Sequence, residues 1–232
     1  MKRAKLILVG CLLLTGFSTA KANSITLYEN AYSYSDGGEF TAFTSPDNFL
    51  GNFAAVATLG GGFETFCEQS SVYFSPGVSY AYALATQDSN GRSVSLGAAF
   101  LYYEFATGAL TGYDYVNAAN RYTDAGELQA AIWWFQGNQT GSGFPAIATD
   151  PFYTLAINDL GAAAFGADNG TYGVELLQLY DSYGNAAQAQ FVLTPPPTSV
   201  PEAGATIIMQ AFACGALALL RGHVRHHGFV RS

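Results

Sequence analysis

Two apolar segments, one near each end of the 232-residue chain, limit how much of it can fold as a water-soluble domain. The first covers residues 6–14, between a basic head that ends at Lys5 and the small-residue stretch Ala20-Lys21-Ala22. This order predicts a secretory signal peptide over residues 1–22. The alternative is a lipoprotein signal with lipid attached to Cys11, but the apolar run before Cys11 is short and continues beyond it.

The second apolar segment covers residues 203–220 and is followed by a tail rich in arginine and histidine, residues 221–232. Its length predicts one transmembrane helix, and the basic tail is expected to stay in the cytoplasm. The proline-rich residues 194–202 predict a semi-rigid linker before that helix. The expected folded part is therefore residues 23–193, which is long enough for one domain with a hydrophobic core.

A short motif precedes the second apolar segment. Val200-Pro201-Glu202 lies directly before it, and Gly204 and Thr206 are at its start. The layout of motif, helix and basic tail resembles the PEP-CTERM class of bacterial sorting signals, and residues 203–206 resemble its VPDxG-type variant. The resemblance implies that a membrane transpeptidase of the exosortase type acts on this motif. The alternative is an ordinary tail anchor. Both interpretations place residues 23–193 outside the cytoplasm, in the cell envelope or the extracellular space.

The charges of the expected folded part exclude several classes of function. Every lysine lies in residues 1–22 and every histidine in residues 221–232, so Arg92 and Arg121 are the only bases against many carboxylates. A strongly acidic domain repels nucleic acid phosphates, so no nucleic-acid partner is expected. Without histidine, neither a Ser-His-Asp or Cys-His catalytic pair nor an ordinary zinc site can form. No metal or cofactor is predicted. Paired carboxylates for glycoside hydrolysis stay open, but no pair stands out.

The residue pattern predicts an α+β fold. Aromatic and small residues between Gly, Asn and Asp clusters indicate strands over residues 52–59, 63–68, 78–86, 172–180 and 188–193. Helical patterns cover residues 93–106, 124–136 and 151–164, and Thr123 or Asp124 is the expected N-cap of the second helix. We therefore expect a single β-rich domain, a sheet or a barrel, with inserted helices, plus the C-terminal transmembrane helix.

Cys67 is the one cysteine in the expected folded part, since Cys11 lies in the signal peptide and Cys214 in the apolar segment. Exported proteins normally pair their cysteines, and a free thiol outside the cell oxidises unless it is buried or capped. One interpretation is a buried, inert thiol that packs like a small apolar residue.

A second interpretation comes from the stretches "ETFCEQ" around Cys67 and "LQAAIWWF" around Gln129. Together they resemble the thioester domains of bacterial surface proteins, with Ile132 and Trp133 in the apolar positions after the glutamine. Leu128 stands where that family often has threonine. The resemblance implies a Cys67–Gln129 thioester cross-link, with Gln129 at a helix start, in a domain that captures an amine-bearing partner covalently. Such a protein is an adhesin and not an enzyme.

The chemistry fits those residue types. A cysteine held against a glutamine carboxamide can displace ammonia, and an external amine can then take the acyl group and free the thiol. A domain without lysine has no ammonium side chain to attack its own thioester, although compositional drift explains the missing lysines equally well. The alternative function is that of a non-reactive structural protein of the envelope or extracellular matrix.

Overall fold

The computed structural model describes residues 23–45, 61–138 and 143–194, which belong to one compact unit that ends at Thr194. Several predicted segments lie outside these residues: the signal peptide, the strand over residues 52–59, residues 195–202 of the linker and sorting motif, and the transmembrane helix. Within the described ranges, no helix has the length and apolar character needed to cross a membrane.

The described chain contains six strands, three α-helices and two short 3-10 helices. The strands are β1 (Ser24–Tyr34), β2 (Gly37–Ser45), β3 (Phe63–Thr65), β4 (Ser79–Ala85), β5 (Val174–Tyr180) and β6 (Gln190–Leu193). The α-helices are α1 (Leu96–Ala106), α2 (Ala118–Phe135) and α3 (Pro151–Leu160), and the 3-10 helices are η1 (Ile147–Thr149) and η2 (Gly161–Phe165). All the strand pairs are antiparallel, in the order β3-β2-β1-β4-β5-β6. The predicted α+β class is confirmed.

The two edges of this sheet meet at one point. Just beyond β3, Cys67 forms an isolated antiparallel bridge with Gln190, the first residue of β6. Two backbone hydrogen bonds flank the bridge, from Phe191 N to Phe66 O (3.1 Å) and from Glu68 N to Ala189 O (2.9 Å). The two outer strands of the sheet, β3 and β6, are therefore connected through the bridge at Cys67.

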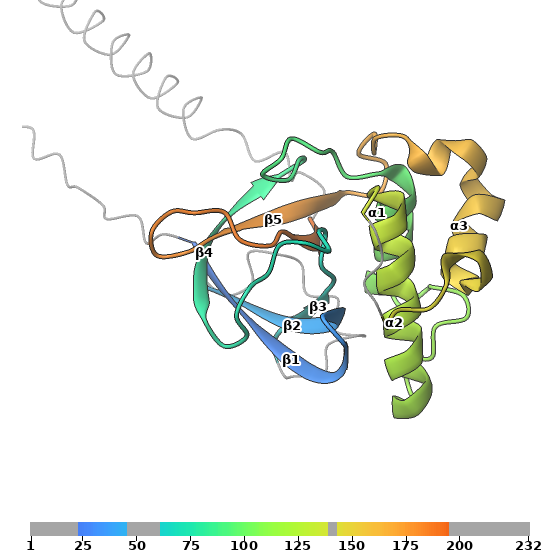
Figure 1. Ribbon diagram of the computed structural model, residues 1–232, viewed down its shortest axis with the longest axis horizontal. Coiled ribbons are helices and arrows are strands. Elements are labelled where there is room, and N and C mark those ends of the chain that lie inside the picture. Colours follow the sequence, from blue (N-terminus) through green and yellow to red (C-terminus); the bar gives the residue numbers. More distant parts are fainter. Residues whose placement is uncertain (1–22, 46–60, 139–142, 195–232) are drawn as a thin grey trace, which may run out of the picture. The chain divides into compact units, whose positions relative to one another are not determined.

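The helices pack together on one side of the curled sheet (Figure 1). A larger core cluster joins α1, α2 and α3 to β5 and β6, and a smaller one, which contains Cys67 and Trp133, lies against the first strands. Leu128, Ile132 and Phe135 of α2 all lie in the larger cluster, so this face of the helix is packed in the core.

The predicted start of the second helix is wrong. The helix begins at Ala118, and the side chain of Asn117 caps it by accepting hydrogen bonds from Ala119 N and Asn120 N. Asp124 has a different role, since its carboxylate accepts from Asp114 N at 2.7 Å in the preceding loop. Gln129 therefore lies in the middle of α2 and not at its start.

Other predicted boundaries need smaller corrections, and one hairpin was not predicted. β3 ends at Thr65 instead of residue 68, and α3 ends at Leu160 and continues as η2. The strands predicted over residues 78–86, 172–180 and 188–193 correspond to β4, β5 and β6. The β1–β2 hairpin was missed, although Ile25 and Leu27 in β1 show the alternation of a half-buried strand.

Candidate functional site

Cys67 occupies a special position in the sheet. In an antiparallel ladder, a residue flanked by hydrogen-bonded neighbours forms a close pair with its partner, and its own N–H and C=O point to the other side. The backbone bonds around the Cys67–Gln190 bridge are made by the neighbouring residues, so Cys67 is such a residue. Its N–H and C=O therefore need partners on the side away from β6.

Gln129 supplies both partners. The Cys67 N–H donates to Gln129 Oε1 at 3.0 Å, and Gln129 Nε2 donates to Cys67 O at 2.8 Å. The carboxamide thus takes the place of the peptide group of a neighbouring strand. The structure brings together the two residues predicted from the sequence, and both are completely buried.

Gly37 leaves the space in which Gln129 lies. A Cβ atom at Gly37 would be 2.7 Å from Gln129 Cγ, closer than real Cβ contacts allow, and in tight contact with Trp133 Cη2 at 3.0 Å. Gly37 is the first residue of β2. Phe40 of β2 pairs with Thr65, the last residue of β3, so the start of β2 lies next to the segment after β3 that contains Cys67. The bare backbone of β2 therefore lets the α2 side chain reach Cys67.

The environment of the Cys67 thiol keeps it protonated. Burial disfavours the thiolate and raises the pKa of Cys67 to about 12, and the negative charge of Glu68 adds to the increase. A hydrogen bond from Gln190 Nε2, 3.7 Å from Cys67 Sγ, acts in the opposite direction. Since the thiolate is the nucleophile, a free Cys67 thiol in this site is a poor target for external reagents.

The apolar residues of the helix motif take the positions expected of them. Ile132 is completely buried, and Trp133 is nearly so and packs edge-on against Phe144. Leu128, the residue before Gln129, lies in the core. Trp134 is 40 % exposed on the other side of the helix. The sorting-motif residues Val200, Pro201, Glu202, Gly204 and Thr206 are outside the described residues.

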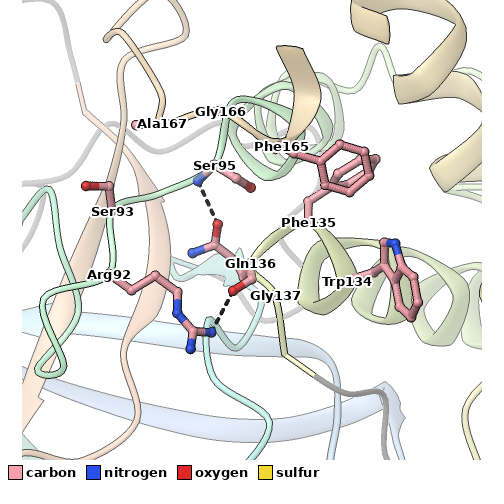
Figure 2. Close-up of a pocket in the computed structure, with 10 residues that line it drawn as sticks. All are labelled: Arg92, Ser93, Ser95, Trp134, Phe135, Gln136, Gly137, Phe165, Gly166 and Ala167. Atoms are coloured by element: carbon pink, nitrogen blue, oxygen red, sulfur yellow. Dashed lines mark hydrogen bonds between the residues drawn. The ribbon is translucent and has the colours of Figure 1, made fainter. Parts of the chain in front are cut away.

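A surface pocket of about 370 Å³ lies at the C-terminal end of α2 (Figure 2). Its walls include Arg92, Trp134 and Phe165, and Gln136 accepts a hydrogen bond from Ser95 N across it at 2.6 Å. The Gln136 amide also donates to Glu68 Oε1 at 2.8 Å, which connects the pocket wall to the residue after Cys67. Cys67, Gln129 and Gln190 are not among the residues that line the pocket.

Two residues of the site were not singled out from the sequence, Gln190 and Gly37. Gln190 comes from a strand that was predicted, but its contact with Cys67 depends on how the sheet edges meet. Gly37 belongs to the hairpin that was missed. The alternation of apolar and polar residues within residues 24–45 could have predicted that hairpin, whereas no local sequence pattern identifies Gln190.

The described ranges hold no group of three or more His, Cys, Asp or Glu side chains arranged to bind a metal ion. In the turns at residues 87–92 and 167–172, side chains of the turn accept hydrogen bonds from nearby backbone N–H groups. Asp88 Oδ1 accepts from Asn90 N, and Asn169 Oδ1 accepts from Thr171 N. No protein-family model, curated protein or solved structure matches the chain.

Proposed function

We propose that this protein is an exported binding protein of the cell surface or extracellular matrix that attaches covalently to an amine-bearing partner through a Cys67–Gln129 thioester. The observation that carries the proposal is the pair of hydrogen bonds between the Gln129 carboxamide and the backbone of Cys67. They hold the carbon that must be attacked beside the residue that carries the sulfur. Holding the carboxamide at the Cys67 backbone limits its freedom of movement and so lowers the entropic barrier to attack by the sulfur of the same residue.

The same contacts favour the attack, whereas burial, which raises the pKa of the Cys67 thiol, opposes it. When Cys67 Sγ attacks Gln129 Cδ, negative charge develops on Oε1, which already accepts a hydrogen bond from the Cys67 N–H. A preorganised donor at a developing oxyanion is one of the larger contributions to such reactions. Ammonia leaves and the thioester remains. An external amine then attacks the carbonyl carbon, becomes an amide on Gln129 and frees the Cys67 thiol.

The rest of the proposal concerns the location of the protein. Residues 1–22 would direct export, and residues 203–220 would hold the protein in the membrane until an exosortase-type transpeptidase acts at residues 200–206. Because each thioester is consumed when it captures a partner, the protein is not a turnover enzyme. The lysine-free domain would not react with other copies of itself through ammonium side chains.

One observation favours a second candidate, a non-reactive structural protein of the envelope or matrix. The two hydrogen bonds from Gln129 satisfy the buried N–H and C=O of Cys67 without any covalent bond. In that case Cys67 is an inert core thiol and Gln129 a structural bridge between α2 and the sheet.

Amine labelling separates the two candidates. The purified protein is treated with methylamine, and the labelled residue is located by peptide mass spectrometry. We expect one methylamide, on Gln129, and one newly freed thiol, on Cys67. Neither is expected in Cys67→Ala or Gln129→Ala, because each removes one reacting group.

Gln136→Ala is the matched control. Gln136 is also a buried glutamine that bonds from the end of α2 to the neighbourhood of Cys67, through Glu68. Its replacement should leave the label on Gln129. Absence of label from the wild-type protein would favour the structural candidate.

A further inference from the structure

The side chain in contact with the Cys67 sulfur is a second glutamine, Gln190, to which the proposed thioester gives no role. Gln190 is completely buried, and its Nε2 lies 3.7 Å from Cys67 Sγ. The contact follows from the sheet, because the two residues form a close pair across the bridge and paired side chains project from the same face. Gln190 therefore touches one of the two reacting atoms.

The oxygen of the Gln190 carboxamide is one of seven buried side-chain polar atoms without a hydrogen-bond partner among the described residues. By contrast, both polar atoms of Gln129 are bonded. Buried polar atoms are nearly always paired, so this acceptor needs an explanation. A donor that is present only during a reaction would provide one. Ammonia and an incoming amine are such donors.

We propose, on the basis of the thioester function above, that Gln190 is a catalytic residue of the site and makes it selective for primary amines. Nε2 donates to the sulfur as negative charge develops on it. Oε1 accepts one N–H of the ammonia that leaves Gln129, or of the amine that replaces it. In this proposal, the carboxamide that contacts the sulfur also binds the nitrogen that the sulfur replaces, or is replaced by, on the Gln129 carbonyl carbon.

The bonds balance without any further reagent. In thioester formation the S–C bond forms and the C–N bond of Gln129 breaks, and the thiol proton leaves with the nitrogen as ammonia. In amine capture the new C–N bond forms and the C–S bond breaks, and one amine proton passes to the sulfur. A neutral primary amine has a second N–H for Gln190 Oε1, whereas a secondary amine has only the one that it must lose. This difference is the basis of the selectivity.

The test compares rates of thiol release by methylamine and by dimethylamine in the wild-type protein and in Gln190→Met, which keeps the length of the side chain without the carboxamide. We expect the methylamine reaction to slow by about ten- to a hundredfold, as expected for loss of a hydrogen bond to a charged group. The dimethylamine reaction should slow less, so the preference for the primary amine should fall.

Gln178→Met is the matched control. Gln178 is also a buried strand glutamine with an unpartnered Oε1, but its amide donates to Leu179 O and Ala187 O, at 3.1 and 2.8 Å. It should lose stability in the same way while keeping the wild-type rates and amine preference. If Gln190→Met does not fold, Gln190→Asn, which withdraws the carboxamide by one methylene, carries the same expectation.

Two failures can be told apart. If the wild-type protein releases no thiol with either amine, the thioester function itself is wrong. If the wild-type protein reacts but the Gln190 variant shows the same methylamine rate and the same amine preference as Gln178→Met, only the role of Gln190 is overturned.

Discussion

At the scale of single residues, the site depends on a glycine as much as on the cysteine and glutamine that would react. Gly37 is buried under Gln129 and Trp133, and its lack of a side chain decides whether the Gln129 carboxamide reaches the Cys67 backbone. A methyl group there would have to displace Gln129 Cγ, which is attached to the helix backbone through a single carbon.

We therefore predict that Gly37→Ala lowers the fraction of protein that carries the thioester, because the added Cβ pushes Gln129 away from Cys67. The fraction is measured by intact mass spectrometry. Gly166→Ala is the control, since Gly166 has an ordinary φ of −76° and the nearest contact of its Cβ is Ala163 O at 3.2 Å. An unchanged fraction in Gly37→Ala would contradict the positioning role of this glycine.

The proximity of Cys67 and Gln129 could be predicted from the sequence, but the geometry of their contact could not. Two short motifs identify Cys67 and Gln129 as partners. That Gln129 bonds to the backbone N–H and C=O of Cys67 follows from the pairing register with Gln190, which joins residues 123 positions apart. Such long-range register has no local signature, because it depends on how the whole sheet closes.

At the scale of elements, α2 determines where Gln129 lies along the sheet. Near the start of the helix, Arg121 forms a two-pronged ion pair with Glu39 of β2, at 2.8 and 2.7 Å, and lies over the Tyr32 ring at 4.4 Å. Tyr113 also donates to Glu39. One turn before Gln129, Gly126 lies against the Tyr34 ring. These contacts fix the axial position of α2 against the β1–β2 hairpin.

We predict that Arg121→Met destabilises the fold by about 3–5 kcal/mol, because it leaves the buried Glu39 carboxylate without its charged partner. The free energy of unfolding is measured by urea denaturation. Arg92→Met is the control. Arg92 is exposed and bonds to Gln136 O and Asn138 Oδ1, so its loss should cost less than about 1 kcal/mol. Equal effects of the two replacements would contradict the anchoring role of Arg121.

The predicted start of α2 was wrong for a local physical reason. Thr123 and Asp124 are both good N-cap residues, and nothing in their immediate neighbourhood excludes them. Asn117 is the N-cap instead, and the Asp124 carboxylate accepts a hydrogen bond from Asp114 N in the preceding loop. The helix is therefore longer at its start than predicted. The additional residues include Arg121, so its ion pair with Glu39 was not predicted either.

At the scale of the whole molecule, the site lies where an isolated bridge connects the two edges of the sheet and α2 packs against it. Cys67 comes from the segment after β3, Gln129 from α2 and Gln190 from β6, so the site exists only in the folded chain. A thioester formed there is expected to be protected by burial of both residues. The same burial explains why the thiol, if it were free, would remain protonated and unreactive.

The most direct test of the thioester is the intact mass of the purified, denatured protein. We predict a mass one ammonia below that calculated for the purified polypeptide, and the calculated mass in both Cys67→Ala and Gln129→Ala. We also predict that the Cys67 thiol does not react with alkylating reagent until an amine is added. A wild-type mass without this loss, together with a Cys67 thiol that alkylates as soon as the chain is unfolded, would contradict the proposal.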